Sequence, residues 1–365
     1  MPKRKVVSVP RTAEHQSFEF VSYGRKGPSG TGQLSPGQME QVARTVGKAP
    51  EVMVKVSGGA RDAGGAKAHF DYIDRHGKLE IETDDGREIL GKDAGAELVA
   101  DWNLDLSKGQ YRPKPQPGEK DTRPKVVHNI VLSMPGSTPA EAVLAAARKF
   151  ARENFALQYR YAMVLHTDQK HPHVHLVVKA EHEYEPGKRL YVRKATLRMW
   201  REQFAQYLRE EGVRANATPK HLRGRAPTGK KDPIHQRLKS VAEYAGLSAE
   251  DKAKRSRPKD STFMRAKVEA VARELQDGVL RPEPGKAKLA ETRKTVVADW
   301  MATAETLRAQ GERELASQVE QFVKGLPAVR TEKEQIAAGL LAQVGALRQR
   351  GVTREAGEPP RNRGG

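Results

Sequence analysis

The sequence predicts an α+β fold with a largely antiparallel central sheet flanked by helices, followed by an all-α C-terminal region. Strand-like and helix-like segments are mixed over about the first 220 residues. Two apolar segments in this part are joined by a short polar turn, which is the pattern of an antiparallel hairpin. Beyond residue 233, apolar residues recur at steps of three and four, as on one face of a helix.

Changes in composition divide the chain into five expected segments. We expect a flexible basic N-terminal arm, a mixed strand-and-helix domain, a basic linker, a helical domain and a disordered tail, at residues 1–50, 51–222, 223–233, 234–356 and 357–365. Within the arm, Ser35 is a candidate N-cap for a short helix.

The elements of the mixed domain are predicted from local patterns. Apolar and β-branched runs predict strands at 51–57, 78–83, 126–133, 160–165 and 173–180. Helical spacing predicts helices at 66–75, 138–154 and 196–212. The second helix begins with Thr138 as N-cap, Pro139 at its first position and Glu141 closing a capping box. In the C-terminal region, four apolar stripes predict a small helical bundle.

Composition restricts the classes of function. The chain carries 65 Lys and Arg against 46 Asp and Glu, a formal net charge of +19, which indicates a polyanionic partner and most simply nucleic acid. The lack of cysteine excludes disulfides, thiolate metal sites and cysteine nucleophiles. No signal-peptide core and no apolar run of membrane-spanning length occurs, so we expect a cytoplasmic protein without a membrane span.

Residues 166–175 hold four of the eleven histidines and a carboxylate. His173 and His175 are two apart in a strand and point to the same side. His166, at the end of the preceding strand, reaches that side across the hairpin. Three converging imidazoles near Asp168 predict a divalent metal site.

A metal held by neutral imidazoles can polarise a phosphate oxygen and stabilise a pentavalent transition state. No P-loop motif is present, so nucleotide hydrolysis of that kind is unsupported. A covalent route would need a hydroxyl, an amine or a carboxylate. Tyr72 is a candidate by position, although on position alone packing beside Phe70 is the better explanation.

Three motifs occur in order along the chain. The run 71–79 is Asp-Tyr-Ile-Asp-Arg-His-Gly-Lys-Leu, the run 131–138 is Val-Leu-Ser-Met-Pro-Gly-Ser-Thr, and the run 166–175 is His-x-Asp…Pro-His-x-His. Together they make residues 51 to about 224 resemble the conjugative DNA relaxases of the mobilisation and T-DNA border endonuclease class, in the HUH endonuclease superfamily. The second motif departs from the family pattern, with Met in place of Phe and a Gly-Ser order before Thr138.

The resemblance implies site- and strand-specific nicking of single-stranded DNA at a plasmid transfer origin. Tyr72 would attack the scissile phosphate, stay linked to the 5′ end and later rejoin the strand. His173 and His175 would hold Mg²⁺ or Mn²⁺, and His166 would be either the third ligand or the base that activates the tyrosine. Asp168 would orient one of the histidines, and Ser133 would contact the DNA near the break.

Basic residues near the motifs are candidate phosphate contacts, although each alone is equally explained as a solvated charge: Lys67, Arg75, Lys78, Arg160 and Lys170. By analogy with the family, accessory transfer proteins, a coupling protein and a type IV secretion channel are expected partners, and the chain would leave the donor cell bound to DNA. Two alternatives remain: a metal-dependent hydrolytic nuclease without a tyrosine nucleophile, and a non-enzymatic DNA-binding accessory protein of the transfer complex.

Overall fold

The computed structural model describes residues 33–107, 115–116, 118–119, 121–224, 248 and 262–355. The chain divides into two compact units, and the described residues 34–218 belong to the first while those from 219 onward belong to the second. Most of the expected arm and linker, and the whole expected tail, lie outside the described residues.

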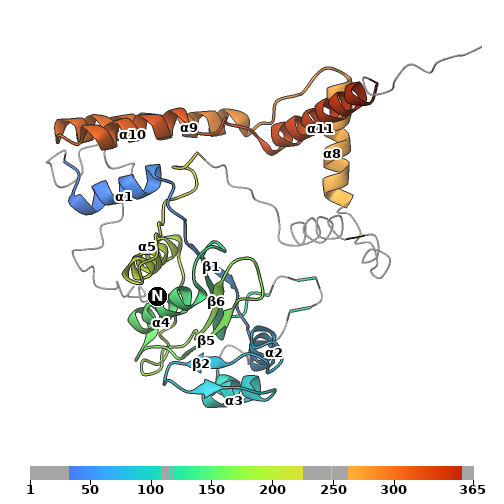
Figure 1. The fold of residues 1–365 in the computed structure, drawn as a ribbon. Helices are drawn as coiled ribbons and strands as arrows, with labels where there is room; N and C mark the ends of the chain where they lie inside the picture. The colour runs from blue at the N-terminus through green and yellow to red at the C-terminus, as the bar shows by residue number, and fades with distance from the viewer. Residues whose placement is uncertain are drawn as a thin grey trace, which may run out of the picture. The chain divides into compact units, whose positions relative to one another are not determined.

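The first unit contains a central sheet with helices on both faces (Figure 1). Its strands are β1 (Met53–Gly58), β2 (Ile81–Thr83), β3 (Glu88–Ile89), β4 (Val127–Ser133), β5 (Tyr161–His166) and β6 (His173–Lys179). In the described residues they form one sheet in the order β1-β4-β6-β5-β2-β3, and each neighbouring pair is antiparallel. The predicted antiparallel α+β architecture is therefore confirmed.

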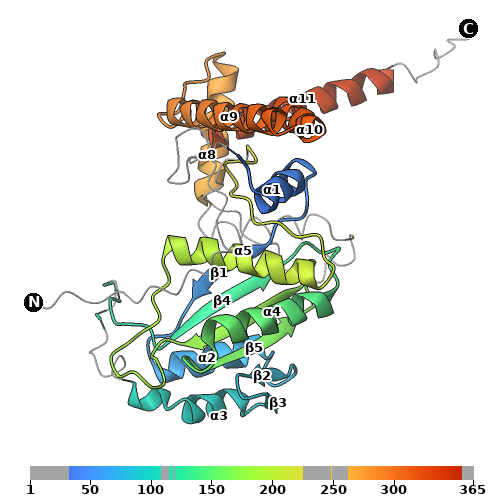
Figure 2. The same ribbon diagram turned by 90° about the vertical axis from the view of Figure 1, so that its left-hand side faces the viewer.

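Helices of this unit cover both faces of the sheet, as Figure 2 shows. The helices are α1 (Pro36–Val46), α2 (Ala63–Ile73), α3 (Ala94–Asp101), α4 (Ala140–Phe155) and α5 (Lys194–Glu210), with the 3-10 turn η2 (Leu104–Leu106). Side chains of α4 and α5 pack on one sheet face in a core that includes Phe150, Trp200 and Phe204. Side chains of α2 and α3 pack on the other face around Phe70 and Trp102. The helix α1 lies outside these two layers.

Part of the expected loose arm is folded. The helix α1 is capped by Ser35, whose side chain accepts from the backbone of Gln38. Thr45 at the end of α1 hydrogen-bonds Thr218 at 2.8 Å and accepts from Asn216 at 3.0 Å. These contacts span more than 170 residues of sequence, so no local pattern could indicate them. The prediction of an arm up to residue 50 is therefore wrong for residues 34–50.

Two further local predictions are corrected. The helix α4 begins at Ala140 with Pro139 as N-cap and has no side-chain cap, so Thr138 and Glu141 form no capping box. The strand β3, the helix α3 and the turn η2 occupy residues 88–106, for which the sequence predicts no element. These short elements depend on burial of Trp102, which lies edge-on to Phe70 with ring centroids 5.4 Å apart.

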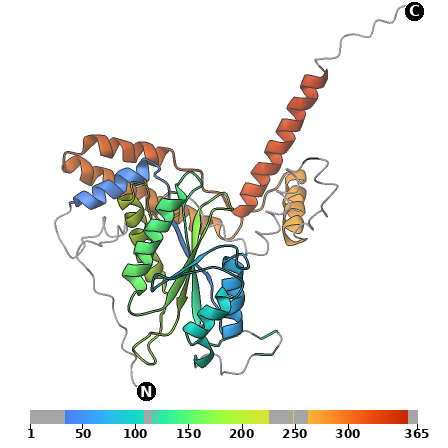
Figure 3. The same ribbon diagram turned by 60° about the horizontal axis from the view of Figure 1, so that its bottom comes forward.

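The second unit is helical where it is described (Figure 3). It contains α8 (Thr262–Gln276), α9 (Lys286–Ala309), α10 (Arg313–Lys324) and α11 (Glu332–Glu355). The buried Trp300 of α9 packs on Phe322 of α10 with ring centroids 5.1 Å apart. Lys267 of α8 pairs with Glu332 of α11 at 2.7 Å. The predicted all-α region is confirmed, and its helices pack chiefly as the pairs α9–α10 and α8–α11.

Candidate active site

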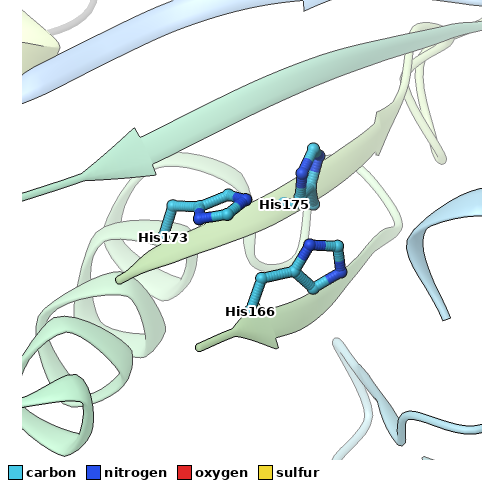
Figure 4. Close-up of side chains that lie close together, drawn as sticks. All are labelled: His166, His173 and His175. Carbon is cyan, nitrogen blue, oxygen red and sulfur yellow. The ribbon is translucent and has the colours of Figure 1, made fainter. Parts of the chain in front are cut away.

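Three histidines converge on the sheet face that carries α2 and α3 (Figure 4). In the register of β5 and β6, His166 lies opposite His173 and Val164 lies opposite His175. Paired residues share a face, as do residues two apart in one strand, so all three imidazoles point the same way. Their ring centroids are 4.6–5.1 Å apart. One ring nitrogen from each lies within 4.8 Å of the others.

The environment of the three rings suits a metal ligand set. Burial, followed by electrostatic interaction with His166 and His173, lowers the pKa of His175 to about 3. Burial also lowers the pKa of His166, although the Ile73 carbonyl opposes this. Neutral imidazole is the form that binds a metal. The Nδ1 atom of His175 is buried and has no hydrogen-bond partner among the described residues.

His173 is held by its own turn. Its Nδ1 lies 3.0 Å from the carbonyl oxygen of His171. A carbonyl only accepts, so Nδ1 donates to it, and Nε2 is the ring nitrogen left to bind a metal. The turn residue His171, whose side chain is exposed, therefore contributes through its backbone.

His166 is fully buried, with both ring nitrogens engaged. Its Nε2 lies 2.5 Å from the carbonyl oxygen of Ile73 and donates to it. Its Nδ1 lies 3.2 Å from the guanidinium of Arg75 and accepts from it, because arginine only donates. As a ligand, His166 would therefore offer Nδ1 after the guanidinium has moved away.

Asp168 contacts Arg75, not a histidine. Its Oδ2 accepts from the Arg75 guanidinium at 2.8 Å. Asp168 therefore does not contact the histidines that it was expected to orient, and it binds the arginine that reaches His166. The interaction crosses more than 90 residues of sequence, from the end of α2 to the turn after β5.

Tyr72 lies on α2 and is 55 % exposed. Its ring stacks on His69 at a centroid distance of 6.3 Å, and the Arg75 guanidinium lies 5.5 Å from the ring centroid. Phe70, by contrast, is fully buried against Trp102. The alternative in which Tyr72 packs in the core beside Phe70 is therefore not what the structure contains.

His69 is the site residue that the sequence analysis missed. Its ring lies between Tyr72 and His175, with a centroid distance of 6.3 Å to each. Burial lowers the pKa of His69 to about 4, and its Nε2 has no hydrogen-bond partner among the described residues. The available signal was its position three residues before Tyr72, which places both on one face of a helix.

The backbone after α2 is left-handed at three successive residues. Arg75, His76 and Gly77 have φ angles of +57°, +58° and +81°. A Cβ at Gly77 would lie 2.5 Å from the backbone carbon of Gly91, so only glycine fits. Positive φ at Arg75 and His76 is rare for residues with side chains. This turn sends the Arg75 guanidinium back toward His166 and Asp168.

The second and third motifs meet at Ser133. Its hydroxyl donates to the carbonyl oxygen of Pro172 at 3.2 Å, and it lies opposite His173 in the sheet. A Cβ at Gly136 would lie 2.1 Å from the carbonyl oxygen of Lys170, so the glycine allows the two turns to touch. Ser133 is 4 % exposed, so its hydroxyl belongs to the floor of the site.

The remaining predicted DNA contacts are placed differently. Lys78 and Lys170 are exposed, and Lys170 lies against Gly136 in the turn after Ser133. Lys67 pairs with Asp71 at 2.8 Å. Arg160 precedes β5, at the end of the strand opposite His166, and pairs with Asp84 and Asp101. The structure therefore does not bring Arg160 to the histidines.

An antiparallel sheet that presents three clustered imidazoles on one face, two of them buried, is an α+β domain able to hold a metal ion. Residues 100–213 match the family model of relaxase nuclease domains of the MobA/VirD2-like type. The matched residues make up about a third of the chain. Tyr72 lies before the matched residues.

Curated relatives agree with the family model. The chain is 33 % identical over 117 residues to the T-DNA border endonuclease VirD2 of Rhizobium rhizogenes, covering 30 % of this chain and 26 % of that protein. It is 32 % identical over 117 residues to VirD2 of Agrobacterium fabrum, covering 30 % of this chain and 25 % of that protein. The matched segment thus spans about a quarter of these relatives.

Among solved structures, the MobM relaxase domain bound to plasmid pMV158 oriT DNA, in an Mn-bound crystal, is 13 % identical. The match covers 52 % of this chain and 98 % of that one, with a TM-score of 0.34. A similarity of this size does not by itself define the fold. No helix in the described part of the chain is long and apolar enough to cross a membrane.

Proposed function

We propose that this protein is a DNA relaxase that nicks single-stranded DNA at a plasmid transfer origin, in a site- and strand-specific manner. The observation that carries the proposal is an exposed tyrosine, Tyr72, which Arg75 and His69 connect to a cluster of three histidines. The match of residues 100–213 to the family model of relaxase nuclease domains supports DNA as the substrate. The net charge of +19 supports a polyanionic partner.

In the proposed reaction the Tyr72 phenolic oxygen attacks the scissile phosphorus. A new P–O bond forms to the tyrosine, the P–O3′ bond breaks, and its electron pair leaves with the 3′ oxygen. The phenol loses its proton and the 3′ oxygen gains one, so one phosphodiester replaces another. The covalent 5′-phosphotyrosine keeps the bond energy, and attack by a 3′ hydroxyl on it rejoins the strand.

His173, His175 and His166 would hold the divalent ion, which would polarise a phosphate oxygen as a Lewis acid. Imidazole is a softer ligand than the oxygen donors that Mg²⁺ prefers, so this ligand set favours Mn²⁺ of the two expected ions. If His166 keeps its bond to the Ile73 carbonyl and is not a ligand, two histidines hold the ion. Nδ1 of His166, once released by Arg75, is then the candidate proton acceptor for Tyr72. Arg75 and Lys170, both beside the site, would face the DNA phosphates.

The test is a denaturing gel after incubation of the protein with Mn²⁺ or Mg²⁺ and single-stranded oligonucleotides tiled across the DNA next to its gene. A shifted band digested with trypsin should carry the DNA on peptide 68–75, which contains Tyr72. The Tyr72→Phe variant should bind the same oligonucleotide and form no adduct.

Other products identify other functions. Cleaved DNA with a free 5′ phosphate and no adduct would establish a hydrolytic nuclease. Binding without cleavage, unchanged in EDTA, would establish an accessory DNA-binding protein. An adduct at normal yield in Tyr72→Phe would move the nucleophile to another residue.

Nicking would take place in the cytoplasm of the donor cell. The helical unit would act in the transfer that follows. We propose that it contacts accessory proteins, the coupling protein or the secretion channel, and that the chain is exported bound to DNA. Deletion of residues 234–365 should then leave nicking intact and abolish transfer. Transfer that survives the deletion would remove this assignment.

A further inference from the structure

The active-site face continues across β4 to the edge strand β1. One row of paired residues crosses four strands, from Met53 through Ser133 and His173 to His166. The next row runs from Lys55 through Val131 and His175 to Val164. Because paired residues share a face, the side chains of Met53 and Lys55 stand on the same face as the histidines.

This end of the sheet face is open. The core beneath α2 and α3 is built on β2, β4, β5 and β6 and includes no residue of β1. Met53 is 44 % exposed, and Lys55 and Ser57 are exposed as well. In the sheet formed by the described residues, β1 is a terminal strand and pairs only with β4.

The chemistry of the open strip is that of a nucleic-acid contact. Lys55 has no carboxylate partner among the described residues, and neither does Lys125, whose ammonium donates to the Gly58 carbonyl at 2.7 Å. The Oδ1 atom of Asn129, which is opposite Gly58, is buried and has no hydrogen-bond partner there. The strip thus offers two cations, one apolar side chain at Met53 and an unused acceptor.

We propose that this β1 strip, made of Met53, Lys55, Ser57, Asn129 and Lys125, holds the single-stranded DNA that flanks the scissile phosphate. The proposal rests on the relaxase function above. Met53 would contact a base, the two lysines would neutralise phosphates, and Asn129 would accept from a base edge. The strand from Met53 to Gly58 is about 17 Å long, enough for several nucleotides of an extended strand.

The first test measures binding of a fluorescent single-stranded oligonucleotide to the full chain at 50–200 mM salt. Lys55→Ala should weaken binding roughly threefold and reduce the slope of log K against log salt by about 0.7, the value for one phosphate contact on a single strand. Lys194→Ala is the matched control, because Lys194 is an exposed lysine on α5, which packs on the opposite sheet face. It should change neither quantity.

The second test places 5-iodouracil at successive positions beside the nick and irradiates the complex. The expected cross-link is on the tryptic peptide 49–55, which contains Met53 and Lys55. Unchanged affinity and slope in Lys55→Ala, or cross-links only to α5, would overturn the proposal. If the β1 edge instead receives a strand of a partner protein, DNA binding will not respond to Lys55, which also overturns it.

The experiments distinguish an error in the β1 strip proposal from an error in the proposed relaxase function. If the relaxase function is wrong, the unaltered chain forms no covalent adduct with any oligonucleotide. If only the strip is wrong, the adduct forms normally and Lys55→Ala binds DNA as well as the unaltered chain.

Discussion

On one face of the central sheet the side chains are large, apolar and fully buried, whereas on the other they include three histidines, a serine and an asparagine. The first face carries ring contacts such as Phe150 against Trp200, with centroids 5.8 Å apart. The second contains buried polar atoms without partners among the described residues, including those of His69 and His175. Each such atom costs about 1–3 kcal/mol of stability. The apolar face therefore stabilises the sheet on which the polar face is built, and mutations on the two faces should have separable effects.

The largest effect on stability is expected on the apolar face. Phe204 is fully buried among Phe150 and its neighbours. Phe204→Ala should lower the free energy of unfolding by about 4 kcal/mol, through lost burial and a residual cavity. Urea unfolding checks this, with the exposed Tyr184→Ala as control. A loss below about 1 kcal/mol would mean that the two faces are not energetically different.

On the polar face, a substitution should change metal binding more than stability. His175→Ala should weaken Mn²⁺ binding by roughly a hundredfold or more, because it removes a metal ligand and not merely a group that hydrogen-bonds to a ligand. Its unfolding free energy should hold or rise, because a buried polar atom without a partner is removed. Calorimetric titration measures the affinity, with His171→Ala as control. Equal affinities in both variants would contradict the ligand assignment.

A third prediction concerns pH. Burial, followed by the charge of Lys125, lowers the pKa of His128 to about 4, and its Nε2 bonds the Leu190 carbonyl. The unfolded chain binds this proton near pH 6.5 and the folded chain does not, so stability falls as pH drops below 6.5. His128 should contribute at most about 2 kcal/mol of loss between pH 7 and pH 5.

His128→Gln should remove that part of the acid loss while it keeps a side-chain donor for Leu190. Thermal unfolding of both chains at the two pH values gives the comparison. The same acid loss in both chains would place the titration on other histidines.

The smallest predicted effect concerns Arg75. Its guanidinium lies 3.2 Å from Nδ1 of His166 and would repel a divalent cation there. Arg75→Met should raise Mn²⁺ affinity roughly tenfold, or 1.4 kcal/mol, and reduce nicking. Arg75→Lys, which keeps the charge, should retain the native affinity. Weaker metal binding in Arg75→Met would show that the arginine supports His166 instead.

The histidine site was predictable because its signal is local. His166, His173 and His175 lie within ten residues, and strand alternation with one turn is enough to bring them together. The antiparallel sheet and the helical C-terminal region follow from periodicity in the same way. The strands β1, β4, β5 and β6 all lie within about two residues of their predicted positions.

What sequence reasoning missed depends on distant contacts. Asp168 meets Arg75 across the fold, and Thr45 meets Asn216, so neither pairing leaves a local pattern. His69 is a lone histidine on a helix. Only the folded structure shows that α2 places its ring next to His175 of β6. Arg160 lies near the third motif in sequence, but the six residues of the extended strand β5 separate it from the histidines.

The turn after α2 carries a cost in backbone conformation. Arg75 and His76 each adopt a left-handed conformation that costs about 1 kcal/mol relative to glycine. A library selected for thermal tolerance alone should therefore enrich glycine at positions 75 and 76. Such variants would be thermally more stable, but glycine at position 75 would remove the guanidinium that contacts Tyr72, His166 and Asp168. At this turn, thermostability and reactivity compete for the same two residues.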